Sequence, residues 1–192
     1  IHSQFSDGDY SVEEIVSKVR ECGIEIFSIT DHDNIESIKA MENVDKRGVV
    51  YIPGVEISCE KDDYKMHILG YNIDANNTKL IQLLQDDTEK FLTAKNFVGQ
   101  TTIARLLVKE RIIPNTQYAF DNYFKYMDLK TPATAPLEQA INTIHLAGGY
   151  AVLAHPISLE KTYGVNIEDI FGMFKNAGID GIEIFNSKHT LS

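Results

Sequence analysis

The chain has 192 residues, enough for one domain with a substantial core. Hydrophobic residues make up 43% and charged residues 24%, and no apolar run approaches the roughly 20 residues of a membrane helix, so we expect no membrane segment. The formal net charge of −10 argues against stable binding to duplex DNA, which requires a basic surface. Two cysteines, Cys22 and Cys59, are too few for a disulfide framework and favour a reducing, cytoplasmic location.

The first third of the chain alternates helical and strand patterns. Apolar residues recur at helical spacing over Val12–Glu21, where Ser11 suits the N-cap and Gly23 follows the end. The β-branched, apolar run Ile24–Ile29 predicts a buried strand. The elements predicted next are a helix over Ile35–Val44 and strands over Val49–Ile52, Val55–Cys59 and Lys65–Tyr71.

The last third repeats this alternation. Helices are predicted over Leu137–Leu146 and Ile167–Asn176, each followed by glycine, and strands over Tyr150–Ala154 and Gly181–Phe185. Strands alternating with helices indicate βα units, and therefore an α/β fold with a parallel sheet or barrel.

The middle of the chain differs from both ends. From Thr78 to about Tyr126 the pattern is helical without a convincing strand. We therefore expect residues 75–131 to form a helical insertion in an α/β frame made of residues 1–74 and 132–192. Abrupt junctions near 90–91 and 128–132 suggest that residues are missing there.

Histidines and carboxylates recur in short stretches that flank or interrupt the predicted strands. Asp31, His32 and Asp33 directly follow the run that ends at Ile29, and His155 directly follows the strand that begins at Tyr150. Functional residues of an α/β barrel lie at these carboxyl ends of strands. Imidazole and carboxylate are ligands that Zn, Mn and Fe share, so the pattern indicates a metal site assembled from several strands.

Each of these residues also has a purely structural interpretation. Asp7 precedes glycine in a common turn, Asp31 and Asp33 suit helix caps, and Glu56 suits a solvated strand position. His145 lies in a predicted helix and is interpreted as a surface or core residue. The recurrence of such residues at the expected positions favours one shared site over several unrelated roles.

Five stretches in order resemble the motifs of the PHP (polymerase and histidinol phosphatase) superfamily. They are His2-Ser3-Gln4-Phe5-Ser6-Asp7-Gly8, Thr30-Asp31-His32-Asp33, Gly54-Val55-Glu56-Ile57-Ser58, His67-Ile68-Leu69-Gly70-Tyr71 and Ala154-His155-Pro156. Within this superfamily the chain is most similar to the bacterial metal-dependent phosphoesterases that act on nucleotides and short oligonucleotides. The segment 98–107 also resembles the helical insertion of that branch.

The resemblance implies a distorted (β/α)7 barrel that holds two or three divalent ions of Mn, Fe or Zn. Glu56 matches a carboxylate that bridges two ions, and Asp31 matches a residue that supports the site. The implied metal ligands are His2, Asp7, His32, Glu56, His67 and His155.

The chain departs from the family pattern in three ways. The first histidine of the pair that ends with His2 would precede Ile1, and the late Asp-x-His motif would follow Ser192. We therefore expect the barrel to be truncated at both ends. In the insertion, Gln100 and Thr102 occupy positions where relatives carry Arg and His, which bears on substrate preference.

These ligands suggest an enzyme that hydrolyses phosphate esters with a metal-bound hydroxide as the nucleophile. We expect a nucleotide or short oligonucleotide substrate, in the manner of a 3′,5′-bisphosphate nucleotidase or a 5′–3′ exonuclease, or another phosphorylated small molecule. The candidates for substrate contact are Asn186, Ser187 and Arg105. His189, with Asp31, is a candidate supporting catalytic residue.

Three alternatives remain. The first is a phosphatase for a small metabolite such as histidinol phosphate, and the helical insertion favours a nucleotide over it. The second is a non-catalytic module that supports a polymerase-type partner, against which the nearly complete ligand set argues. The third is a hydrolase of carbon–nitrogen bonds, for which the sequence lacks a carboxylated-lysine context. The metal, the oligomeric state and the preferred ester stay open.

Overall fold

The computed structural model describes residues 1–93, 107–108, 110–114, 118–119, 122–124 and 134–185. The chain divides into two compact units, one of Ile1–Gln85 with Thr134–Ser192 and one of Asp86–Ala133. The second unit overlaps the predicted insertion of residues 75–131, whose identity as an insertion stays a prediction. Within it, Ile113, Ala119 and Phe124 form a small buried cluster.

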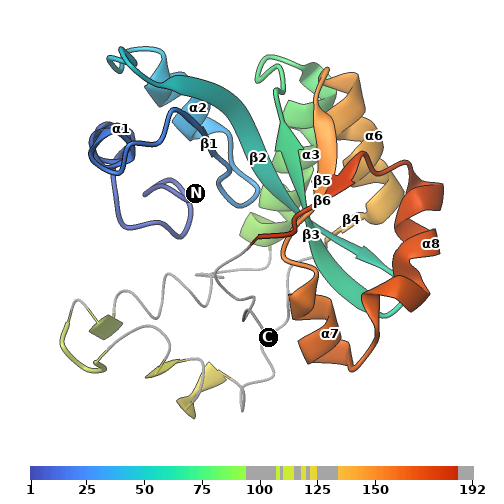
Figure 1. The fold of residues 1–192 in the computed structure, drawn as a ribbon. Helices are drawn as coiled ribbons and strands as arrows, with labels where there is room; N and C mark the ends of the chain where they lie inside the picture. The colour runs from blue at the N-terminus through green and yellow to red at the C-terminus, as the bar shows by residue number, and fades with distance from the viewer. Residues whose placement is uncertain (94–106, 109, 115–117, 120–121, 125–133, 186–192) are drawn as a thin grey trace. The chain divides into compact units, whose positions relative to one another are not determined.

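Most predicted elements are present, with small changes at their ends (Figure 1). The helices are α1 (Val12–Glu21), α2 (Glu36–Met41), α3 (Thr78–Thr93), α6 (Leu137–Leu146), α7 (Ile157–Tyr163) and α8 (Ile167–Ala177). The strands are β1 (Ile26–Ile29), β2 (Val50–Lys61), β3 (Tyr64–Tyr71), β4 (Ala135–Pro136), β5 (Tyr150–Leu153) and β6 (Gly181–Ile182). None of the helices in the described ranges has the length and apolarity that crossing a bilayer requires.

The strands form one mixed sheet in the order β1-β2-β3-β5-β6, and β4 pairs with β2. β1–β2 and β5–β6 are parallel, but β3 runs antiparallel to both β2 and β5. The prediction of an α/β fold is therefore confirmed, whereas a wholly parallel sheet was wrong. Among the described strands the sheet does not close, so the (β/α)7 barrel stays a prediction.

β2 replaces two predicted strands with one continuous strand. Its first half pairs with β1 up to Ile29↔Pro53, and its second half pairs with β3 from Gly54 onward. Pro53 has no N–H to donate and lies where the partner strand changes, so the strand continues through it. The prediction from sequence failed because a Pro-Gly pair normally ends a strand.

Two short elements, β4 and α7, were not predicted. α7 begins directly after Pro156 and ends at Gly164, whose φ of 67° is left-handed. Its seven residues are too few for a clear apolar period. α1, in contrast, carries complete end signals, because Ser11 and Glu14 form a capping box in which each side chain binds the other residue's backbone N–H.

Two apolar clusters hold the first unit together. The larger one lies between the sheet and the helices α3, α6, α7 and α8, and the smaller one joins α1, β1 and α2. In Figure 1, α6 and α8 lie beside β5 and β6, whereas α1 and α2 lie beside β1. The large side chains that are almost fully buried include Phe174, Ile29, Met41, Ile57, Ile68, Leu80, Leu137, Ile141, Ile144 and Leu153.

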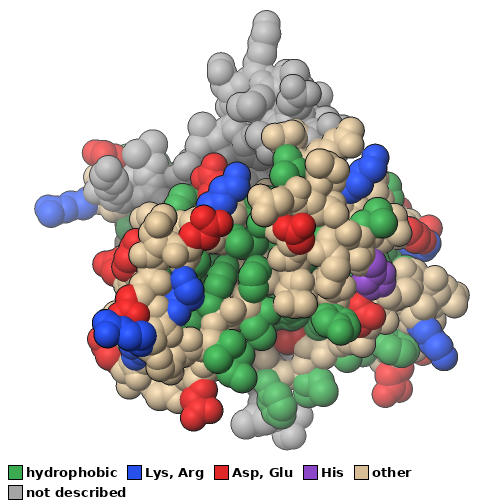
Figure 2. Space-filling view, turned by 90° about the horizontal axis from the view of Figure 1, so that it is seen from above, with side chains coloured by type: hydrophobic (Ala, Val, Ile, Leu, Met, Phe, Trp, Pro, Cys, Tyr) green, Lys and Arg blue, Asp and Glu red, His purple; other side chains and the backbone are tan. Residues whose placement is uncertain are grey.

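The two ends of the sheet have different chemistry. Figure 2 shows hydrophobic side chains gathered in the middle of the face at which β1, β2 and β5 begin. Ile26, Val50 and Tyr150, the first residues of these strands, are each more than half exposed. In the candidate site, His32 and His155 follow the carboxyl ends of β1 and β5, Glu56 and His67 lie inside β2 and β3, and His2 and Asp7 lie in the loop before α1.

We predict that Phe174→Ala destabilises the protein by about 3–5 kcal/mol, because a fully buried ring is replaced by a cavity. Phe171→Ala on the same helix is the matched control, since Phe171 is 41% exposed and should contribute within about 0.5 kcal/mol. Urea unfolding of the two variants measures the difference. Equal losses would show that α8 does not pack through Phe174.

Candidate metal centre

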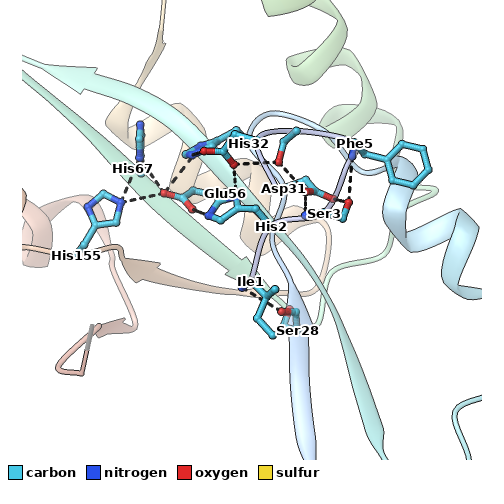
Figure 3. Close-up of polar contacts among 12 residues, drawn as sticks. Ile1, His2, Ser3, Phe5, Ser28, Asp31, His32, Glu56, His67 and His155 are labelled. Atoms are coloured by element: carbon cyan, nitrogen blue, oxygen red, sulfur yellow. Dashed lines mark hydrogen bonds and ion pairs between the residues drawn. The ribbon is translucent and has the colours of Figure 1, made fainter. Parts of the chain in front are cut away.

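Four histidines surround the carboxylate of Glu56, which lies in the middle of β2 (Figure 3). The chain after β1 makes a parallel bridge that sets His32 directly beside Glu56. His67 lies on β3 opposite Ser58. Ser58 is two residues after Glu56 in β2, so His67 lies on the same face of the sheet as Glu56. His155 follows β5, where the Ala154 N–H donates to the His67 carbonyl at 3.1 Å.

One group of ligand atoms forms a tight triangle on Glu56. Oε1 of Glu56 lies 2.8 Å from Nδ1 of His67 and 3.1 Å from Nε2 of His155. These two ring nitrogens lie 3.3 Å from each other. The three side chains are placed to hold one ion.

A second group of ligand atoms, from His2 and His32, forms around the same carboxylate. Nε2 of His2 lies 3.2 Å from Oε2 of Glu56, and Nδ1 of His32 lies 4.0 Å from Oε1. The two rings stack with their centres 4.6 Å apart. Asp7 lies on the opposite edge of both rings, 3.1 Å from His2 Nδ1 and 3.8 Å from His32 Nε2.

The electrostatics of the centre favour an ionised Glu56 and a neutral His32. Burial would raise the pKa of Glu56, but hydrogen bonds with His155, His2 and His67 outweigh it and hold the pKa well below its usual range. Burial lowers the pKa of His32, and repulsion by His67 and His2 acts in the same direction against the attraction of Glu56. Neutral imidazole is the form that binds metals.

The donor set fits divalent metal ions. Ligand bonds of about 2.0–2.2 Å bring neighbouring donor atoms about 3.0–3.4 Å apart, and the Glu56, His67 and His155 atoms meet close to that spacing. Nδ1 of His2 is buried and faces Asp7 without making a hydrogen bond, which is expected of two groups that both point at a cation. Nitrogen and oxygen donors of this kind suit Zn, Mn and Fe alike.

The aspartates that flank His32 point away from this centre. Asp31 is fully buried and accepts hydrogen bonds from the backbone N–H and hydroxyl of Ser3, at 2.6 and 2.7 Å, and from the hydroxyl of Ser6 at 2.6 Å. It thereby ties the loop that carries His2 and Asp7 to the end of β1. The supporting role of Asp31 in the site stays a prediction.

Asp33 makes a similar connection on the other side of His32. Its carboxylate accepts the backbone N–H of Ser58 at 2.8 Å and the Ser58 hydroxyl at 2.7 Å. Its own N–H donates to the Glu56 carbonyl, and its φ of 48° lies in the left-handed region. The interpretation of both aspartates as helix caps was wrong, because Asn34 is the residue whose side chain accepts from the start of α2.

A cavity of about 440 Å³ opens over the centre. Six residues of its lining had no site role predicted from the sequence, namely Ile1, Thr30, Leu69, Tyr71, Ala154 and Glu183. Burial, with Glu183 and Glu56 nearby, raises the pKa of Tyr71 to about 12, so its phenol stays protonated. Three of these residues had a signal in the sequence. Leu69 and Tyr71 alternate with His67 along β3, and Glu183 lies just after the start of a predicted strand.

The other predicted site residues do not join this cluster or cannot be placed. Arg105, Asn186, Ser187 and His189, like Gln100 and Thr102, lie outside the described residues. His145 binds Asp180 at 2.8 Å, apart from the cavity lining. Lysine and arginine side chains are absent from the described lining of the cavity, so cations bound at Glu56 would be the main source of positive charge there.

The fold and this cluster define an α/β domain with a candidate metal centre, and the sequence comparisons identify its family. The family model described as "PHP domain" matches residues 1–184, and the chain belongs to the PHP family. This finding confirms the resemblance drawn from the five motifs.

Proteins from three bacteria are similar to this chain along most of its length. A 5′-3′ exoribonuclease of Haemophilus influenzae is 32% identical over 98% of this chain and 78% of its own length. The 5′-3′ exoribonuclease Rnm of Escherichia coli is 31% identical over 81% of this chain, which spans 63% of that relative. A 3′,5′-nucleoside bisphosphate phosphatase of Chromobacterium violaceum is 26% identical over 99% of this chain and 76% of its own length.

Solved structures share the fold. A structure from Chromobacterium violaceum, described as an amidohydrolase with bound sulfate and no metal, superposes with a TM-score of 0.82 at 27% identity, covering 99% of this chain and 77% of that one. A metal-dependent phosphoesterase of Bifidobacterium adolescentis, described as putative, superposes with a TM-score of 0.79 at 20% identity, covering 95% and 74%.

We predict that the metal-free protein loses stability as the pH falls from about 7 to about 5. The pKa of His32 is lowered below 6.5 in the folded state, so below that pH the unfolded chain binds a proton that the folded protein does not. Urea unfolding in chelator across this range measures the slope, and His32→Gln should reduce it. An unchanged slope in the variant would contradict the lowered pKa.

Proposed function

We propose that this protein is a metal-dependent phosphoric ester hydrolase that acts on nucleotides or short oligonucleotides. The observation that carries the proposal is the convergence of four imidazoles on the buried carboxylate of Glu56. The metal ligands we assign are His2, Asp7, His32, Glu56, His67 and His155. Glu56 is the carboxylate common to both groups of ligand atoms, so it is the residue suited to bridge two ions.

Two or three divalent ions bound here would supply Lewis acidity and lower the pKa of water, as in other phosphoesterases that use paired metals. The chain's own residues set the geometry for this chemistry. Glu56 stays ionised and His32 stays neutral because of their surroundings. Asp31 and Asp33 hold the two loops that deliver His2 and His32 to the centre.

An anionic substrate fits this cavity when bound cations balance its charge. Its described lining carries Asp7, Glu56 and Glu183 and no lysine or arginine side chain, so a phosphate would meet repulsion there without bound metal. The named relatives include two exoribonucleases and a nucleoside bisphosphate phosphatase, and the Chromobacterium violaceum structure holds sulfate, a tetrahedral oxyanion like phosphate. These relatives favour a nucleotide ester over a small metabolite such as histidinol phosphate. The description of that structure as an amidohydrolase would instead favour a carbon–nitrogen bond as the target.

The test uses the purified chain with Mn²⁺ and three substrates, namely an aryl phosphodiester, a nucleoside 3′,5′-bisphosphate and a short 5′-phosphorylated RNA. We expect release of phosphate or nucleotide from at least one of them, and loss of that activity after chelation. Bound metal without hydrolysis of any of the three would reject the phosphoesterase assignment.

We predict that His32→Ala lowers the hydrolysis rate by more than about 100-fold while the far-ultraviolet circular dichroism stays that of the folded protein. His145→Ala is the matched control, because His145 binds Asp180 away from the cavity lining and should keep the rate of the unsubstituted protein. Retained activity in His32→Ala would remove His32 from the ligand set.

A further inference from the structure

Glu183 contacts the candidate centre through the backbone of a ligand. The Oε2 atom of its carboxylate accepts the backbone N–H of His155 at 2.7 Å. The Glu183 N–H in turn donates to the Leu153 carbonyl at 2.9 Å, so the residue continues the pairing of β6 with β5. Glu183 also lines the cavity, although it belongs to none of the family motifs found in the sequence.

His155 has a backbone conformation that needs such a partner. Its φ is 28°, a region that residues with a side chain rarely adopt and that surrounding contacts must impose. The Ser158 N–H holds the His155 carbonyl at 2.8 Å, which leaves Glu183 to fix the N–H side. A change in this φ would rotate the imidazole, whose Nε2 lies 3.1 Å from Glu56 and 3.3 Å from His67.

We propose that Glu183 is a positioning residue that locks His155 in its strained conformation and so aims its ring nitrogen at the metal centre. The inference rests on the proposed function, since it takes the Glu56 cluster to be a metal site. The bond requires an acceptor oxygen at the right distance from the His155 N–H. It does not require the negative charge of the carboxylate.

The same sheet edge provides a matched control. Asp180, just before β6, accepts the Ala151 N–H at 2.7 Å, a carboxylate bond to a backbone N–H of the same length as that of Glu183. Asp180 lies at the other end of the pair of strands, and its second partner is His145. Removing Asp180 therefore costs the sheet a comparable bond without touching the cavity lining.

The experiment is calorimetric titration of Mn²⁺ into the chelator-treated chain and its variants. Glu183→Ala should weaken Mn²⁺ binding by about 10–100-fold, the usual effect of losing a partner that orients a metal ligand. Glu183→Asp, which keeps the charge but is one methylene shorter, should weaken it similarly. Glu183→Gln, which keeps an oxygen at the right distance, should bind Mn²⁺ like the unsubstituted chain, and Asp180→Ala should lower only the thermal unfolding midpoint.

The outcomes separate this inference from the function it rests on. If the unsubstituted chain binds no Mn²⁺, the metal centre itself is rejected and this inference with it. If that chain binds Mn²⁺ and Glu183→Gln loses as much affinity as Glu183→Ala, the charge matters and the positioning role is overturned. Unchanged binding in both Glu183→Ala and Glu183→Asp would also overturn it. Should Glu183→Ala fail to fold, the comparison of Glu183→Gln with Glu183→Asp decides.

Discussion

A buried carboxylate imposes the main constraint on this fold. The Glu56 side chain is 3% exposed, and removing an ionised carboxylate from water costs several kcal/mol unless opposite charge or hydrogen bonds compensate. The neighbours of Glu56 are imidazoles, which can donate hydrogen bonds but repel one another when protonated. The protein therefore keeps an arrangement that bound cations would stabilise far better than protons do, and this is the physical argument for a metal centre.

The mixed sheet is what makes this arrangement possible. β1 runs parallel to β2, and the chain that follows β1 brings His32 beside Glu56. β3 runs antiparallel to β2 and brings His67 to the same face from the opposite direction. Because β5 is antiparallel to β3, its carboxyl end lies next to the middle of β3, and His155 meets His67 there. A wholly parallel sheet would align only strand ends, and the two inner positions, Glu56 and His67, would need other ways to reach the centre.

Local patterns in the sequence were sufficient to predict several helices and the residues of the cluster around Glu56. The helices α1 and α6 match their predicted bounds because apolar spacing and flanking glycine signals agree. The cluster around Glu56 was foreseen because its residues occur in ordered motifs. The antiparallel direction of β3 was not predicted, because apolar alternation does not encode strand direction. Glu183 was missed because its bond to a backbone N–H forms only when β5 and β6 are paired, and its place near the start of a predicted strand does not reveal that partner.

The charge distribution links substrate binding to metal occupancy. The chain carries a net charge of −10, and the described lining of the cavity holds three carboxylates. Nucleic acid binds many proteins through a broad basic surface, with an affinity that falls steeply as salt rises. Here the proposed cations would provide the attraction at one point, which suits a substrate with a terminal phosphate or a short single strand. Under this proposal, selectivity for small phosphate esters arises from the net negative charge and the metal centre acting together, because the net charge disfavours long polyanions while the centre attracts one phosphate group.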